Sequence, residues 1–259
     1  MAKLSMLAEL PKHTREAVAF YWRTRSSQVE KQRKAGGADQ GLRSAVTGGA
    51  HMDGFIALLT KLVIEAGIDS THIYHRESLE LPGYFRPTKR WDFLVVVNGQ
   101  LIAALETKSQ VGPSFGNNFN NRTEEAMGSA LDLWTAYREQ AFGSAIRPWI
   151  GYLFLLEDCA SSTKSVGVKE PHFKVFPEFL KSSYAKRYEL FCRRLVLEKH
   201  YDTRPFLCPV RTLVCKGRFP NQPRTFHFRP LRIRWLPGLP PFRAASNNYE
   251  ARRFGPGGH

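Results

Sequence analysis

The 259-residue sequence predicts an α/β fold in which helices flank a mixed central sheet. Two observations carry this prediction. Segments of helical periodicity and short apolar strands follow one another in the order helix, three strands, helix, strand. The clearest strands form a hairpin over residues 91–108, where two runs rich in Val, Ile and Leu are joined by Asn98-Gly99, a pair typical of a tight turn.

Helical periodicity predicts two helices ahead of this hairpin. The first is expected over residues 14–34 and is followed by a glycine-rich basic loop that reaches residue 49. The second is expected over residues 51–66, where apolar residues recur on one face. A first strand is then expected over residues 70–79.

The segments after the hairpin complete the predicted order. A polar loop with glycine punctuation is expected over residues 109–121. A helix should then begin at Arg122, with Asn121 as its N-cap. A buried strand is expected over residues 149–156, and residues 173–197 continue with helical character.

Three ionisable residues interrupt the apolar pattern of the hairpin. Asp92 begins the first strand, whereas Glu106 and Lys108 end the second. Burying charge is costly unless the charge is paired or bound to metal, so this placement indicates a functional site. Lys108 lies two residues after Glu106 and therefore points to the same face of a strand. The cluster is similar to the metal site of PD-(D/E)xK nucleases, with the run Lys-Arg-Trp-Asp at 89–92 in place of the usual Pro-Asp start.

Phosphodiester cleavage explains these residue types. A divalent metal polarises the phosphoryl oxygen, and Mg²⁺ prefers oxygen ligands, including one or two carboxylates. Asp92 and Glu106 would supply those carboxylates, with the backbone carbonyl of Thr107 as a further ligand. The Lys108 ammonium would orient and help to deprotonate the attacking water. The alternative is a chance match between surface charges, which this spacing allows.

The metal site also makes a prediction about the turn. With a strict two-residue loop at Asn98-Gly99, Asp92 would pair with Leu105, and its side chain would lie on the opposite face from Glu106. A three-residue loop over residues 98–100, or an equivalent β-bulge, restores the direct pairing of Asp92 with Glu106. The nuclease interpretation therefore predicts one of these two irregularities.

Nucleases of this class often take a further acidic ligand from a helix such as the one expected at residues 51–66. Asp53 and Glu65 flank its apolar face on opposite sides, and the residues alone do not choose firmly between them. Asp53 is favoured because it lies within the segment that resembles the family described next. Its alternative role is compensation of the charge at the helix N-terminus.

The catalytic strand and the segments around it resemble the XhoI family of type II restriction endonucleases. The stretch over residues 106–139 is the distinctive part, supported upstream by residues 45–49 and 52–55. The resemblance covers roughly residues 15–200. It implies a PD-(D/E)xK restriction-endonuclease-like core and a Mg²⁺-dependent enzyme that cuts both strands of double-stranded DNA at the palindrome CTCGAG. By position, Asp92, Glu106 and Lys108 match the family's catalytic motif.

A palindrome that is read symmetrically calls for a two-fold homodimer. The candidates for base contacts follow the catalytic strand, because Asn can pair with adenine and Arg with guanine: Asn117, Asn118, Asn120, Asn121 and Arg122. Arg43, in the glycine-rich loop, is a candidate for a backbone contact. The alternative for the Asn residues is a structural role in turns and the helix cap, and the alternative for the loop is a flexible connector.

Composition agrees with a nuclease of this kind. No apolar run is long enough to span a membrane, and the first residues do not open a signal peptide. The four cysteines show no Cys-x-x-Cys spacing, so they are expected to be reduced in a cytoplasmic protein. The net charge of +15 is uneven, since residues 203–259 hold eleven Lys and Arg against one acidic residue.

The last segment also differs from the rest in proline content, with nine of the sixteen prolines. We therefore expect an endonuclease domain at residues 1–202 and a basic Pro/Arg-rich tail at residues 203–259. The tail is either an irregular cationic arm, which would strengthen non-specific DNA binding, or the product of a shifted reading frame.

Two other functions remain open on the residues alone. A repair or recombination nuclease would use the same site without sequence specificity. A non-catalytic basic DNA-binding protein would make the charged triad accidental.

Overall fold

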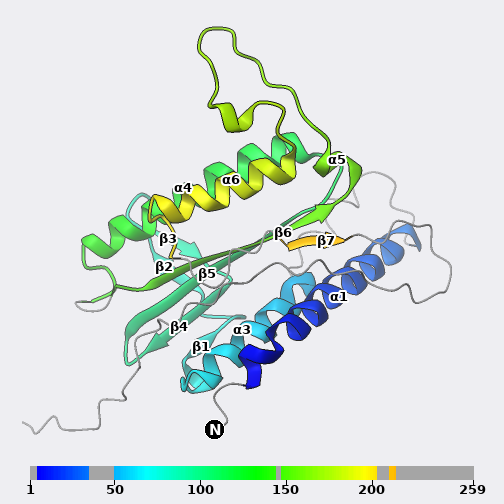
Figure 1. The fold of residues 1–259 in the computed structure, drawn as a ribbon. Coiled ribbons are helices and arrows are strands. Elements are labelled where there is room, and N and C mark those ends of the chain that lie inside the picture. The colour runs from blue at the N-terminus through cyan, green and yellow to red at the C-terminus, as the bar shows by residue number, and fades with distance from the viewer. Residues whose placement is uncertain (1–4, 35–49, 144–146, 203–209, 214–259) are drawn as a thin grey trace, which may run out of the picture.

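The computed structural model describes residues 5–34, 50–143, 147–202 and 210–213 (Figure 1). Its centre is a five-stranded sheet with the order β1-β4-β5-β6-β7. The strands are β1 (Ile73–Tyr74), β4 (Phe93–Val97), β5 (Gln100–Gln110), β6 (Trp149–Asp158) and β7 (Val210–Leu213). The pairs β1-β4 and β4-β5 are antiparallel, whereas β5-β6 and β6-β7 are parallel, so the sheet is mixed, as predicted.

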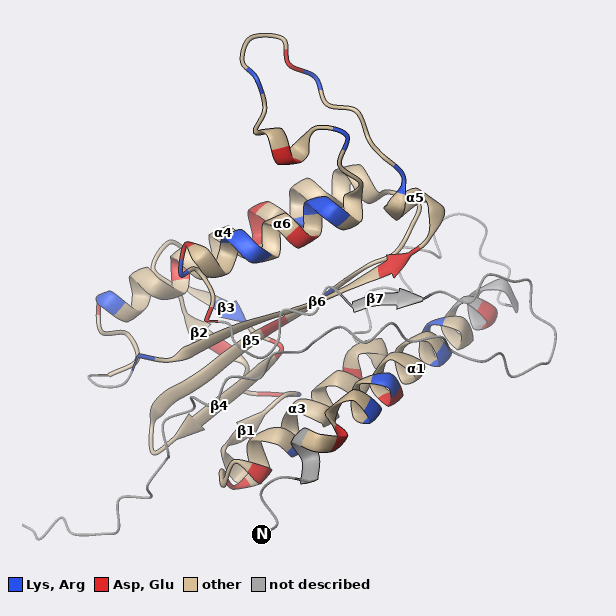
Figure 2. Ribbon diagram, viewed as in Figure 1, with Lys and Arg blue, Asp and Glu red and all other residues tan. Residues whose placement is uncertain are grey.

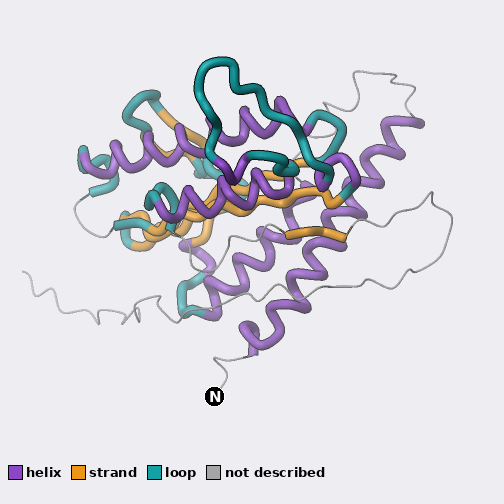
Figure 3. Tube along the Cα trace, turned by 45° about the horizontal axis from the view of Figure 1, so that its top comes forward, coloured by secondary structure: helices purple, strands orange, loops and turns teal. Residues whose placement is uncertain are grey.

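Helices cover both faces of the sheet (Figures 1 and 3). The pair α4 (Phe115–Arg138) and α6 (Tyr184–Leu197) lies on one face, and the pair α1 (Ser5–Lys34) and α3 (Asp53–Glu65) on the other. Side chains of β5 alternate between the two layers: Ala104 packs in the core below α4, and Leu105 packs in the core beside α3. The expected α/β fold with flanking helices is confirmed.

The strand expected over residues 70–79 is wrong in its extent. A single 3₁₀ turn (Ser70–His72) precedes β1, which has only two residues. A second hairpin follows that was not predicted, formed by β2 (Glu80–Pro82) and β3 (Thr88–Arg90). Its strands are too short for a period-2 pattern to be visible, and tertiary packing holds them, because the Leu79, Leu81 and Trp91 side chains are buried in the core below α4.

The helix after the catalytic strand begins seven residues earlier than expected, at Phe115 instead of Arg122. Ser114, not Asn121, occupies the N-cap position. Phe115 is 2% exposed, and Phe119 packs edge-on against Tyr188 with 4.9 Å between the ring centroids. Burial of these two rings one helical turn apart outweighs the low helix propensity of the intervening Gly and Asn residues.

The remaining elements differ mainly in length. Helix α1 begins at Ser5, and the predicted helical stretch over residues 173–197 contains one 3₁₀ turn (Pro177–Phe179) and α6. A short 3₁₀ turn (Ala50–Met52) leads into α3, and a one-turn helix, α5 (Ala160–Thr163), follows β6. Within the described residues, no helix is long and apolar enough to cross a membrane.

Strand β7 adds Val210–Leu213 to the sheet, beyond the domain boundary predicted at residue 202. Residues 203–209 and 214–259 lie outside the described residues, so the irregular or frame-shifted tail stays a prediction. Arg43, Cys208 and Cys215 also lie outside the described residues. The two described cysteines, Cys159 and Cys192, are both free.

Candidate active site

The β4–β5 hairpin contains the β-bulge that the metal-site interpretation requires. Asn98 and Gly99 have φ values of 52° and 72° and form a two-residue turn, so that Val97 pairs with Gln100. The register then shifts between Val95 and Val96, and from there Phe93 pairs with Leu105. This register ends at Phe93, and Asp92, the next residue, donates its backbone N–H to the Leu105 carbonyl oxygen at 3.2 Å. The predicted irregularity is therefore confirmed as a bulge.

Glu106 is the most deeply buried of the charged residues at this end of the hairpin, with 5% exposure. It shares the sheet face of Ala104, which α4 covers. Both of its carboxylate oxygens are ion-paired: the Lys108 ammonium contacts Oε1, and the Lys89 Nζ lies 2.6 Å from Oε2. Such a buried carboxylate needs compensating charge, because desolvation of an unpaired charge costs several kcal/mol.

Lys89 is a site residue that sequence reasoning did not single out. Its side chain is only 12% exposed, and its ammonium also lies over the Trp91 ring, 4.7 Å from the centroid. Lys89 and Trp91 are two residues apart on an extended segment, and this spacing was a usable signal. The signal was missed because the strand that carries Lys89, β3, was not predicted.

Asp92 directly precedes β4 and lies beside β5. Its Oδ2 accepts hydrogen bonds from the Thr107 backbone N–H at 2.7 Å and from Thr107 Oγ1 at 3.0 Å. The N–H and C=O of one strand residue point to the same side of the strand, so the Thr107 carbonyl points to the side of β5 where Asp92 lies. The structure thus brings Asp92 against Thr107, the neighbour of Glu106.

The donor set at this position suits a hard cation. It offers two carboxylates and a backbone carbonyl, and Mg²⁺ takes such oxygen ligands together with several waters. No group of three His, Cys, Asp or Glu side chains within the described residues could hold a metal by itself. The residues therefore fit Mg²⁺ with a largely aqueous shell better than a tightly enclosed Zn²⁺.

The acidic ligand expected on α3 is not brought to this cluster. Asp53 is exposed at the first position of α3, and Glu65 is the last residue of the same helix. Helix α3 packs on the face of the sheet opposite Glu106. Both residues therefore lie across the sheet from the proposed metal ligands.

His51 lies close to β5 on that opposite face. Its Nε2 is 3.5 Å from Ser109 Oγ, and its ring packs edge-on against Tyr21 at 5.2 Å. Burial lowers the pKa of His51 and the charge of Arg25 lowers it further, which together outweigh the opposite effect of Asp53.

The candidates for base contact lie within the first turns of α4 and not in a loop. Asn117, Asn120 and Asn121 are exposed, and their spacing places them on one face of the helix. Asn118 is half-buried. Arg122 is also half-buried: its Nη1 pairs with Glu125, and its Nε is buried.

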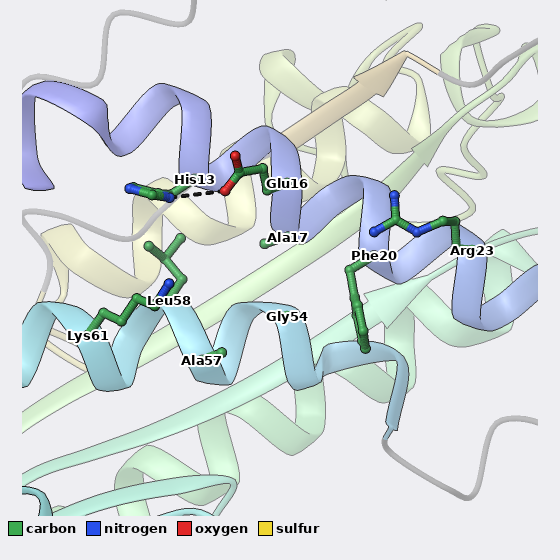
Figure 4. Close-up of a pocket in the computed structure, with 9 residues that line it drawn as sticks. All are labelled: His13, Glu16, Ala17, Phe20, Arg23, Gly54, Ala57, Leu58 and Lys61. Carbon is green, nitrogen blue, oxygen red and sulfur yellow. Dashed lines mark hydrogen bonds and ion pairs between the residues drawn. The ribbon is translucent and has the colours of Figure 1, made fainter. Parts of the chain in front are cut away.

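A separate cavity of about 230 Å³ lies between α1 and α3 (Figure 4). Phe20, Gly54 and Leu58 contribute to its lining, and the His13 Nδ1 lies 3.0 Å from Glu16 Oε2 at its rim. These two helices cover the sheet face opposite Glu106, so the cavity is not part of the charged cluster.

Comparisons with known proteins support one family. A family model described as "Restriction endonuclease XhoI" matches residues 31–221. The chain is 59% identical over 176 residues to the type II restriction enzyme BstVI of Geobacillus stearothermophilus, an alignment that covers 66% of this chain and 79% of the relative. It is 49% identical over 203 residues to the type II restriction enzyme XhoI of Xanthomonas vasicola, covering 77% and 80% of the two chains. No solved structure matches the chain.

Proposed function

Because the chain belongs to the XhoI family of restriction endonucleases, we propose that it uses Mg²⁺ to cut both strands of double-stranded DNA at the palindrome CTCGAG. Membership of the family makes the chain a type II site-specific deoxyribonuclease. The Mg²⁺ requirement and the recognition sequence go beyond that and are part of the proposal. The observation that carries the catalytic assignment is the convergence of Asp92, Glu106 and Lys108 at one end of the β4–β5 hairpin.

In this proposal, Asp92, Glu106 and the Thr107 carbonyl hold the metal. The bound Mg²⁺ supplies Lewis-acid stabilisation of charge on the phosphoryl oxygens. The Lys108 ammonium donates hydrogen bonds to the attacking water and to the phosphate, and Glu106 holds that ammonium in place. Glu106 is buried, so its interaction with the Lys108 ammonium takes place in a medium of lower dielectric constant than bulk water.

Lys89 acts beside these residues as a positioning group. Its ammonium neutralises the second oxygen of Glu106 when neither metal nor DNA is bound. When DNA and metal bind, the Lys89 ammonium can leave Glu106 and pair with a phosphate oxygen instead. Glu106 would then be free to bind the metal, so that DNA binding favours metal binding.

Recognition is assigned to the exposed face of α4 that carries Asn117, Asn120 and Asn121. Their amides can pair with base edges in the major groove, which admits an α-helix. This helix directly follows the catalytic strand, so its first turns lie near the DNA whose phosphate occupies the cluster. Two copies related by a two-fold axis would present two such helices and two catalytic clusters to a palindrome.

Plasmid digestion tests the proposed function. Purified protein should convert a plasmid with several CTCGAG sites into discrete fragments when Mg²⁺ is present and should leave it intact in EDTA. A smear would instead identify a nuclease without sequence specificity. Binding without cleavage would identify a non-catalytic DNA-binding protein.

A further inference from the structure

The turn of the β2–β3 hairpin exposes two large aromatic side chains next to each other. Tyr84 is 55% exposed and Phe85 is 66% exposed, and their rings pack edge-on at 5.0 Å between centroids. A single exposed apolar residue is common, but adjacent exposed rings on one turn more often mark a contact surface. We call residues 83–87 the aromatic tip.

A buried carboxylate holds the backbone of the aromatic tip. Asp132 of α4 is 3% exposed, and its Oδ1 accepts hydrogen bonds from the backbone N–H groups of Tyr84 at 2.8 Å and Phe85 at 2.9 Å. Its Oδ2 accepts a hydrogen bond from Arg86 Nε at 2.6 Å. Three hydrogen bonds to one charged group thus hold a turn whose two aromatic side chains are exposed.

The turn leaves no room for a side chain at Gly83. A Cβ atom at this position would lie 2.6 Å from the Arg86 carbonyl oxygen and 2.7 Å from Asp132 Oδ2, which is closer than real Cβ contacts. The tip is therefore preorganised, and the two rings lose little conformational entropy when they bind a partner.

The tip is connected directly to the catalytic cluster. Lys89 follows Phe85 by four residues and contacts Glu106. Four extended residues span at most about 13 Å, which is less than half of a duplex turn of about 34 Å. The tip therefore lies within half a duplex turn of Lys89, the residue that contacts Glu106.

The charge of the hairpin also favours DNA as the partner of the tip. The β2–β3 hairpin carries three basic residues, Arg86, Lys89 and Arg90, against one acidic residue, Glu80. Each of the three is ion-paired, to Asp132, Glu106 and Glu80 respectively, and the Arg86 and Arg90 side chains are still 44% and 57% exposed. Strand β3 is blue in Figure 2 because two of its three residues are basic. Phosphate groups complement this charge, whereas two such tips facing each other across a two-fold axis would repel.

We propose that the aromatic tip contacts the DNA bound at the catalytic cluster. Tyr84 and Phe85 pack against bases beside the cleaved phosphate, and Arg86 pairs with the backbone. Apolar side chains that insert between base steps and aromatic rings that stack on bases are established ways to hold DNA. This inference rests on the proposed function, because it requires that DNA binds at Glu106.

The test compares the double variant Tyr84→Ala/Phe85→Ala with wild type and with Phe173→Ala. Phe173 is 88% exposed in the segment between α5 and α6 and serves as the matched control. Binding of a labelled duplex carrying CTCGAG is measured by fluorescence anisotropy in EDTA and in Ca²⁺, which avoids cleavage. A third variant, Tyr84→Phe/Phe85→Tyr, keeps both rings.

The tip variant should bind the duplex about tenfold or more weakly, the size expected for loss of base-stacking rings. The Phe173→Ala and ring-exchange variants should bind like wild type, and all variants should unfold at the wild-type temperature. Wild-type affinity in the alanine variant would overturn the inference. Loss of self-association in that variant, measured by sedimentation, would assign the tip to a contact between copies and overturn it as well.

Failure of the proposed function is distinguishable from these outcomes. Wild-type protein that neither cuts plasmid nor binds the duplex would remove both proposals before any variant is compared. Wild-type protein that cuts and binds, together with an alanine variant that binds equally well, would remove only the assignment of the tip.

Discussion

Lys89 Nζ lies 2.6 Å from Glu106 Oε2, although the two residues are 17 positions apart and belong to different sheets. Lys108 takes the other oxygen of the same carboxylate. Both carboxylate oxygens of Glu106 are therefore paired with ammonium groups. Metal binding must compete with a cation that the protein itself provides.

Replacing Lys89 with Met should raise the Mg²⁺ affinity of the DNA-free protein about tenfold. The change removes a competing positive charge next to a proposed ligand, and an interaction of this size is ordinary for charges in a partly buried site. Calorimetric titration of Mg²⁺ into the free protein measures it without reliance on cleavage.

Arg90→Met is the matched control, because Arg90 precedes Trp91 and pairs with Glu80 instead of Glu106. Its Mg²⁺ affinity should stay within about twofold of wild type, since the removed charge is exposed and screened. Equal affinities for the Lys89→Met variant and the wild type would show that Lys89 does not compete with the metal.

Asp132→Ala should lower the free energy of unfolding by about 3 kcal/mol, because it leaves two backbone N–H groups and a guanidinium without their acceptor. Urea denaturation measures the loss. A loss below about 1 kcal/mol would mean that water replaces the carboxylate at little cost.

The contribution of Asp132 should also depend on pH. Burial alone would raise its pKa, but the hydrogen bonds from Phe85, Arg86 and Tyr84 outweigh burial and hold the pKa below its ordinary value of 3.8. A lowered folded-state pKa gives stability that is fully present above the unfolded-state value and is lost as the pH falls through the folded-state value. The difference in melting temperature between wild type and Asp132→Asn should therefore shrink between pH 6 and pH 3, and a constant difference would contradict the assignment.

Base recognition by α4 predicts different outcomes for neighbouring residues. Asn117→Ala removes an exposed amide and should weaken binding to a CTCGAG duplex by about tenfold while binding to unrelated DNA stays unchanged. Arg122→Ala removes a half-buried, ion-paired side chain and should lower thermal stability instead. Equal losses of Asn117→Ala on both DNAs would indicate a backbone contact.

Oligomeric state is a further prediction of the proposed function. Sedimentation should show a dimer on a duplex with one CTCGAG site, because two clusters are needed to cut both strands at symmetric positions. A monomer both free and on DNA would remove the two-fold arrangement.

The sequence predicts the elements that are held by residues close together in the chain, and it misses those held by residues far apart in the chain. The β4–β5 hairpin was predictable because a local turn signal, apolar strands and misplaced charges coincide there. The register also predicted an irregularity, either a three-residue turn or a bulge, and the structure has a bulge between Val95 and Val96.

The β2–β3 hairpin and the start of α4 were not predictable from local patterns. The hairpin is held by Asp132, 46 to 48 residues away, and by burial of Trp91. Helix α4 begins early because Phe115 and Phe119 pack against α6, whose residues lie about 70 positions later. Lys89 was missed because β3 was not predicted, and its contact with Glu106 depends on tertiary structure.

The most direct test of the central claim is cleavage and binding by the Lys108→Ala variant, measured side by side. Under single-turnover conditions with Mg²⁺ and a CTCGAG duplex, cleavage should fall by at least about 1,000-fold, because a preorganised group at the reacting phosphate is lost. Affinity for the same duplex in Ca²⁺ should stay within about threefold of wild type, and Glu106→Ala should lose Mg²⁺ affinity instead. Cleavage by Lys108→Ala at close to the wild-type rate would contradict the assignment of the catalytic cluster.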